Sequence, residues 1–125
     1  MSSFLLYLGA AVVSLWGIAH LVPTRNVVAG FGDINRDNRH IITMEWIVEG
    51  VSMLFIGALV IVVTIIDPAA ATSQAVYAVS IVGLIALALV ALFTGFKVKF
   101  LPFRLCPFVL TLAALLVLAG ALSWR

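Results

Sequence analysis

Charged residues are scarce in this sequence. Lys, Arg, Asp and Glu make up 10% of the 125 residues, whereas hydrophobic residues make up 65%. Water-soluble domains carry roughly 25% charged residues, so this composition excludes an ordinary soluble domain. It predicts an integral membrane protein, and the length leaves room for one transmembrane domain over residues 1–125.

Cysteine is scarce as well, and the familiar motifs of soluble enzymes are missing. The single cysteine, Cys106, excludes an intrachain disulfide. We expect it to be a small side chain that is buried or lies at a helix interface. The sequence has no Walker loop, Rossmann glycine pattern, nucleophile elbow or CxxC pair. Its net charge is only +2 and the basic residues form no patch typical of nucleic-acid binding, so we expect no nucleic-acid partner.

What the sequence does contain is a set of long apolar runs, each near the roughly 20 residues needed to cross a bilayer. Inside a bilayer each run must satisfy its own backbone hydrogen bonds, so the runs are predicted to be helices. The alternation expected of a barrel strand is missing. The predicted fold is all-α, a bundle of four transmembrane helices with a long first loop; the helices span about 4–22, 41–66, 74–96 and 104–124.

The basic residues predict an orientation in the membrane. They concentrate in the first and third loops, and the second loop has none; they are Arg25, Arg36, Arg39, Lys97, Lys99 and Arg104. By the positive-inside rule, loops 23–40 and 97–103 are predicted to be cytoplasmic, and both termini and the second loop are predicted to lie outside. Arg125 is the exception to this pattern.

Two glutamates lie early in the second apolar run, where a charge is costly. Counting back about 20 residues from position 66 places Glu45 at the headgroups and Glu49 about one turn inside the bilayer. His20 ends the first run at nearly the same depth. Helical spacing puts Glu45, Glu49 and Ser52 on one stripe, beside a stripe of glycines that admits a neighbouring helix. We therefore predict a shared cavity on the cytoplasmic side with His20, Glu45 and Glu49 as candidate catalytic residues.

Other polar and aromatic side chains are expected to line the same cavity. They share the depth of the glutamates or belong to the first loop, and they are Trp16, Trp46, Ser52, Asn26, Arg36, Arg39, His40 and Arg104. A different interpretation stays open. Glu45 and His20 would then keep their polar groups in interfacial water, and Glu49 would be a structural partner of Arg104 or Arg39.

No metal site is predicted, and no cofactor can be assigned. Asp33, Asn35 and Asp37 match the start of a calcium loop, but its sixth position lacks glycine and its twelfth lacks glutamate. A metal bound by His20, His40 and Glu49 is conceivable, but the sequence has no H-x-x-x-H or H-x-x-E pair to support it. We expect Asp37 instead to cap the second helix.

The second half of the chain is less informative. The third run has no charged residue, so it is expected to serve packing and lipid contact. Tyr77, near its outer end, is predicted to be an interfacial anchor. Pro107 is predicted to lie in the first turn of the last helix, where proline is tolerated.

The motif "GIAH", which ends the first run, and "EWIVEGVSMLFIGALV" in the second resemble the DoxX-like group of small bacterial membrane proteins. The resemblance in helix layout extends over most of the chain. It implies a multi-pass protein of the bacterial inner membrane with an accessory or redox-associated role, and it names no substrate.

Two functions of different class are considered. The first is an accessory membrane subunit that forms homo- or hetero-oligomers by packing through its glycine stripes in the lipid bilayer. The second is a membrane-embedded acid/base enzyme, an isomerase or a redox-linked enzyme, acting on a lipophilic small molecule such as an isoprenoid or quinone. The layout also resembles emopamil-binding isomerases, in which histidine and glutamates line a helical cavity.

Overall fold

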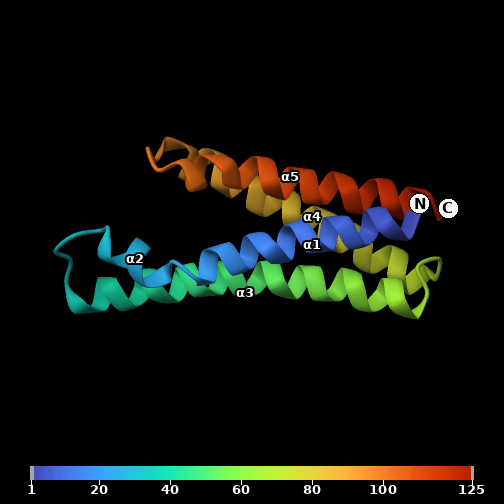
Figure 1. Cartoon of the computed structure of the whole chain (residues 1–125), viewed down its shortest axis with the longest axis horizontal. Coiled ribbons are helices and arrows are strands. Elements are labelled where there is room, and N and C mark those ends of the chain that lie inside the picture. Colours follow the sequence, from blue (N-terminus) through green and yellow to red (C-terminus); the bar gives the residue numbers. More distant parts are fainter. Residues whose placement is uncertain (1, 125) are drawn as a thin grey trace.

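Four long helices form the molecule, and the computed structural model describes residues 2–124 (Figure 1). Each of them is long and apolar enough to cross a membrane. A short helix follows the first, and a single 3-10 turn precedes the last. No described residue lies in a strand, so the predicted all-α class is confirmed. The elements are α1 (Ser2–Leu21), α2 (Thr24–Ala29), α3 (Arg36–Ile66), α4 (Ala71–Phe93), η1 (Gly95–Lys97) and α5 (Leu101–Leu122).

Helix α1 is the centre of the bundle. It packs along both α3 and α5, and α4 packs along α5, whereas α3 and α4 make few contacts with each other. The bundle is therefore two helix pairs, α1 with α3 and α4 with α5, joined through α1. The pairs diverge toward the end that carries α2 and η1 (Figure 1).

Small residues allow α1 and α3 to approach closely. A Cβ added at Gly17 would lie 2.8 Å from the carbonyl oxygen of Gly50, and a Cβ added at Gly57 would overlap the Ser14 hydroxyl. Close contact of this kind is a common way to hold transmembrane helices together. The glycine stripe of α3 therefore packs against α1 within the chain, and the predicted close approach of a neighbouring helix is confirmed.

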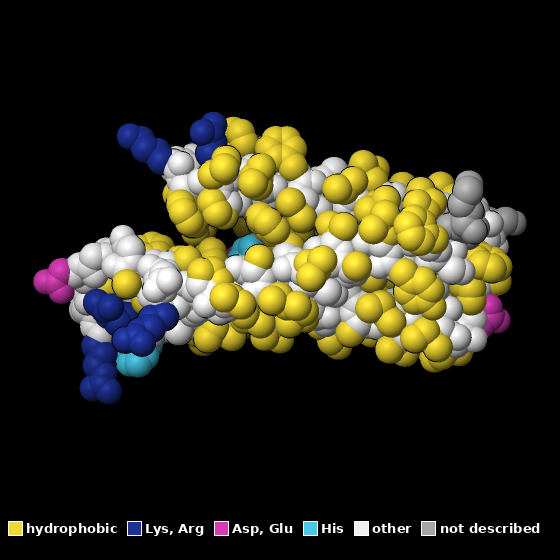
Figure 2. All heavy atoms as spheres, in the orientation of Figure 1, with side chains coloured by type: hydrophobic (Ala, Val, Ile, Leu, Met, Phe, Trp, Pro, Cys, Tyr) yellow, Lys and Arg dark blue, Asp and Glu magenta, His cyan; other side chains and the backbone are white. Residues whose placement is uncertain are grey.

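The two ends of the bundle differ in charge. Lysine and arginine side chains gather at the end with α2 and η1, and hydrophobic side chains cover most of the visible flank (Figure 2). The opposite end holds both termini and the Asp67 turn (Figure 1). Arg125, the exception in the topology prediction, lies outside the described residues. The exposed hydrophobic flank and the apolar helices identify a small multi-pass membrane-like helical protein.

The long first loop is more helical than predicted. Helix α3 begins at Arg36 instead of near residue 41, and α2 occupies part of the connector. The N-cap of α3 is Asn35, whose Oδ1 accepts a hydrogen bond of 2.8 Å from the backbone N–H of Asn38. The prediction that Asp37 caps the helix was wrong, since it lies within the first turn of α3. Asparagine and aspartate are both good caps, so composition alone did not separate them.

Two expectations about the second half of the chain were also wrong. Helix α5 starts with Pro102 in its first turn, so Pro107 lies inside the helix. Tyr77 is fully buried, and its hydroxyl pairs with the Thr64 hydroxyl at 2.8 Å. It joins α3 to α4 instead of anchoring the chain at a membrane surface. A tyrosine at a helix end can serve either purpose, because its ring is apolar and its hydroxyl polar.

Candidate functional site

A cavity of about 910 Å³ lies where the two helix pairs diverge. All the helices contribute to its wall, from Trp16 on α1 to Val27 on α2, Trp46 on α3, Leu87 on α4 and Phe103 on α5. Most of the lining side chains are apolar. Figure 2 shows a hollow between the helix pairs with histidine atoms inside it. We call this space the main cavity.

His20 is the buried polar residue of the main cavity, and it is 7% exposed. Helix α1 ends one residue later, ahead of Pro23, which has no backbone N–H to donate. Nδ1 of His20 lies 3.0 Å from the carbonyl oxygen of Trp16. A carbonyl oxygen only accepts, so Nδ1 carries the hydrogen, and in the neutral ring Nε2 has a free lone pair.

Two tryptophans fix the orientation of the His20 ring. Trp46 stacks on it, with ring centroids 4.8 Å apart, and Trp16 meets it edge-on at 5.7 Å. The indole N–H of Trp46 donates to the carbonyl oxygen of His20. This carbonyl is one of the last in α1 and has no partner within the helix. Trp46 also contacts the Phe103 ring at 5.2 Å, so the aromatic residues tie α1 to α3 and α5.

Glu49 comes from α3 and faces His20. The distance between His20 Nε2 and Glu49 Oε1 is 3.8 Å, and the glutamate side chain is 35% exposed. This separation is longer than a hydrogen bond, which is about 3 Å. One polar atom can therefore lie against both groups, about 2.8 Å from each. The predicted pairing of Glu49 with Arg39 or Arg104 is not seen: Arg39 donates to the Gly32 carbonyl, and Arg104 lies over the Phe96 ring.

Cys106 completes the polar group. It is buried on α5, and its Sγ accepts a hydrogen bond of 3.4 Å from the indole N–H of Trp16. His20, Glu49 and Cys106 each offer one ligand atom, and these atoms lie within 4.8 Å of one another. We call these residues the His20–Glu49–Cys106 cluster. The sequence did not predict that Cys106 lies beside His20 and Glu49, because no spacing in the chain links residues of three separate helices.

The other predicted site residues separate into two sets. Trp16, Trp46, Ser52 and Glu45 line the main cavity, although the Ser52 hydroxyl is occupied by the Val48 carbonyl and Glu45 is exposed. The remaining candidates are exposed and lie outside the described lining of the cavity; they are Asn26, Arg36, Arg39, His40 and Arg104. The catalytic roles of His20, Glu45 and Glu49 stay predictions.

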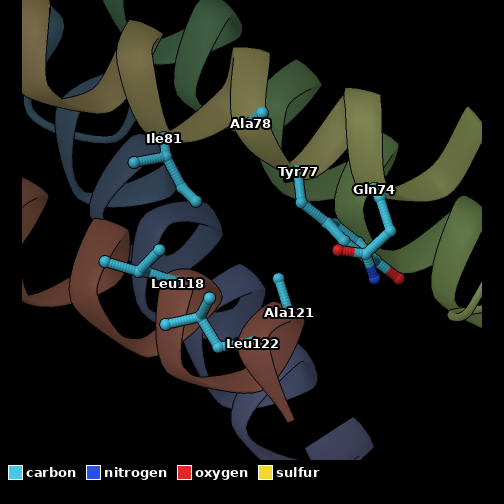
Figure 3. A pocket seen from close by; sticks show the side chains of 7 residues that line it. All are labelled: Gln74, Tyr77, Ala78, Ile81, Leu118, Ala121 and Leu122. Carbon is cyan, nitrogen blue, oxygen red and sulfur yellow. The ribbon is translucent and has the colours of Figure 1, made fainter. Parts of the chain in front are cut away.

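A second, smaller cavity of about 190 Å³ lies between α4 and α5 toward the opposite end (Figure 3). Its lining is almost entirely apolar, and its polar residues are Gln74 and Tyr77. Nε2 of Gln74 donates to the Pro68 carbonyl, and the Tyr77 hydroxyl is paired with Thr64. The main cavity, with its larger volume and polar cluster, is the better candidate for function.

Comparisons with protein families, curated proteins and solved structures find no match for this chain.

Proposed function

We propose that this membrane protein binds a lipophilic small molecule in the main cavity and acts on the molecule's polar group by acid/base chemistry. The observation that carries the proposal is the facing pair His20 and Glu49 in a cavity of about 910 Å³. Sites for small molecules are typically apolar cavities of about 300–1,000 Å³ with a few converging polar groups. An isoprenoid or quinone combines the apolar body and the single polar end that such a site selects.

The geometry of the pair suits proton transfer. Nε2 of neutral His20 is a proton acceptor, because Nδ1–H is committed to the Trp16 carbonyl. Glu49 Oε1 lies 3.8 Å away. When Glu49 is protonated, a hydroxyl or enol oxygen between them donates its hydrogen to Nε2 and accepts the carboxyl hydrogen, so His20 removes a proton while Glu49 returns one. General acid/base catalysis requires such contact at hydrogen-bonding distance. The stacked Trp46 ring keeps the imidazole from turning away.

The orientation of the chain is part of the proposal. The main cavity lies toward the end that carries the basic loops, and the positive-inside rule assigns that end to the cytoplasm. The bacterial inner-membrane location and the DoxX-like resemblance remain predictions. A cytoplasmic cavity between lipid-facing helices is accessible to a substrate dissolved in the bilayer.

The accessory-subunit hypothesis is weaker than the sequence suggested. Its specific argument was a glycine stripe available to a partner, and Gly50 and Gly57 instead contact α1. Oligomer formation through other apolar surfaces remains an expectation, and no specific residue supports it.

The test is native mass spectrometry of the untagged protein extracted in detergent from its host membrane, compared with Glu49→Gln. We expect a bound small molecule on the wild-type protein and its loss in the variant, since the amide keeps the shape but not the charge or basicity of the carboxylate. Asp37→Asn is the matched control, because it makes the same change on the same helix at an exposed position.

A wild-type protein without a bound molecule, or a molecule retained equally in Glu49→Gln, would contradict the proposal. A stoichiometric protein partner present in every variant would favour the accessory subunit. Lipids from the extracted membrane added back to the purified protein show whether detergent had removed the molecule.

A further inference from the structure

We propose that the His20–Glu49–Cys106 cluster binds one zinc-type divalent metal ion, with an open coordination position toward the main cavity. The sequence predicted no metal site, because no two of these residues are close in the chain. The structure brings imidazole, carboxylate and thiol together from α1, α3 and α5. This inference does not depend on the proposed lipophilic ligand. With the ion bound, Nε2 of His20 and the Glu49 carboxylate would be its ligands, so the acid/base pair of the proposed function would belong to the metal-free protein.

The ligand distances fit a small ion. The ligand atoms lie within 4.8 Å of one another, and the His20–Glu49 separation is 3.8 Å. In a tetrahedral zinc site with bonds of about 2.0–2.3 Å, ligand atoms are roughly 3.3–3.8 Å apart. The upper limit of 4.8 Å exceeds this range by about 1 Å, so the side chains would have to move closer together to bind the ion. Imidazole and thiolate are ligands that zinc prefers, whereas calcium and magnesium require oxygen.

The charges of the cluster balance those of the ion. Binding of the ion would release the Cys106 thiol proton to solvent. A neutral His20, a Glu49 carboxylate and the resulting Cys106 thiolate then carry a total of two negative charges, which a divalent cation neutralises. A neutral complex is favourable in an apolar region, where an isolated charge is costly. No lysine or arginine lines the described part of the main cavity, so the protein itself supplies no competing cation there.

The surrounding residues hold the ligands as metal sites require. Metal-binding histidines usually donate their other ring N–H to a carbonyl or carboxylate, which orients the ring. His20 does so through Nδ1 and the Trp16 carbonyl, and this leaves Nε2 for the ion. The indole N–H of the same tryptophan donates to Cys106 Sγ, as donors near metal thiolates do. Trp16 therefore positions two of the ligands at once.

The number of ligands predicts the class of site. Structural zinc sites use four protein ligands, whereas catalytic sites use three and leave one position for water or substrate. The His20–Glu49–Cys106 cluster supplies three, and all line the main cavity. The open position is thus available to an oxygen of a molecule bound there.

The experiment titrates the purified, untagged protein with Co²⁺, a spectroscopic substitute for zinc, and then with Zn²⁺. We expect one equivalent of Co²⁺ to bind with a thiolate-to-cobalt charge-transfer band, which Zn²⁺ then abolishes by displacement. The chain has a single cysteine, so this band reports on Cys106 alone. Cys106→Ser should lose the band, and His20→Gln and Glu49→Gln should each weaken Zn²⁺ binding by at least about tenfold.

His40→Gln is the matched control, because it removes the other histidine from an exposed position. It should bind like the wild type. Protection of Cys106 from N-ethylmaleimide by one equivalent of Zn²⁺ provides a test on the wild-type protein, in case a variant does not fold. The metal site would be overturned by absence of the cobalt band, by lack of protection of Cys106, or by an unchanged Zn²⁺ affinity in His20→Gln. Loss of the copurified lipophile alone would bear only on the proposed function.

Discussion

The indole N–H of Trp16 lies 3.4 Å from Sγ of Cys106, although 90 positions separate the two residues in the chain. Trp16 is on α1 and Cys106 on α5, so this hydrogen bond joins the central helix to its neighbour. The Trp16 carbonyl also accepts the Nδ1 hydrogen of His20. One residue thus orients two chemically different side chains in the same wall of the main cavity.

Replacing Trp16 with phenylalanine separates these contributions. Trp16→Phe keeps an aromatic ring and the backbone carbonyl, but it removes the N–H that donates to Cys106. We expect Zn²⁺ affinity to fall about tenfold, as for other residues that support a metal ligand. The cobalt charge-transfer band should persist, since the ligands remain. Trp124→Phe, at an exposed position after α5, is the control. Equal affinity in both variants would exclude a positioning role for Trp16.

The contact between α1 and α3 depends on Gly17. A Cβ there would lie 2.8 Å from the Gly50 carbonyl oxygen, and backbone cannot move aside as a flexible side chain can. We expect Gly17→Ala to destabilise the protein by about 1–3 kcal/mol from overpacking, partly offset by the better helix propensity of alanine. The thermal unfolding midpoint in detergent should fall accordingly.

Gly83→Ala is the matched control for this change, because the nearest atom to an added Cβ, Ile56 Cδ1, is 3.9 Å away. It should be neutral or slightly stabilising. If both variants unfold at the same temperature, the close approach of α1 and α3 is not a source of stability.

Composition and helical period were enough to predict the four helices, because an apolar run in a bilayer must satisfy its own backbone hydrogen bonds and a helix does so. Counting back from the outer end of the second run was also enough to place Glu49 near the depth of His20, although α3 begins at Arg36 and Glu49 lies near the middle of that helix. The distance between them, 3.8 Å, depends on how α1 and α3 pack. The glycines of α3 predicted a close neighbour but did not identify α1 as that neighbour.

Cys106 and Tyr77 show why the remainder could not be predicted. The partners of Cys106 come from other helices, so its sequence neighbours contain no signal. A tyrosine near a helix end is typical of an interfacial anchor. The burial of Tyr77 is explained only by the position of Thr64, across the turn between α3 and α4. Arg39 and Arg104 were reasonable partners for Glu49 by charge, but their side chains have the Gly32 carbonyl and the Phe96 ring as partners.

The Thr64–Tyr77 hydrogen bond is expected to couple α3 to α4 energetically. Tyr77→Phe and Thr64→Val each remove it, at a cost of about 1 kcal/mol. The double variant should cost little more than one single variant, giving a coupling energy of about 0.6 kcal/mol or more, as is typical inside membranes. Unfolding in a denaturing detergent measures all four proteins. Thr64→Ser keeps the hydroxyl and should behave like the wild type, whereas additive costs would show that the two groups do not interact.

The orientation of the chain can be tested with introduced cysteines. In a Cys106→Ser background, Asn38→Cys marks the end with the basic loops and Ala69→Cys marks the turn after α3. The positive-inside rule predicts that a membrane-impermeant maleimide labels only Ala69→Cys in intact cells. Asn38→Cys should be labelled only after the membrane is opened. The reverse pattern would place the main cavity on the outer side of the membrane.

Filling the main cavity should displace its ligand without disturbing the fold. Ser52 lines the cavity, and its hydroxyl contacts only the Val48 carbonyl, so Ser52→Phe leaves no buried polar group unpaired. Ala58→Phe introduces the same ring at an exposed position of the same helix. We expect the copurified lipophile to be lost from Ser52→Phe and retained by Ala58→Phe, with similar thermal midpoints for both. Retention of the lipophile in both variants would mean that it binds to the outer surface and that the main cavity is not its binding site.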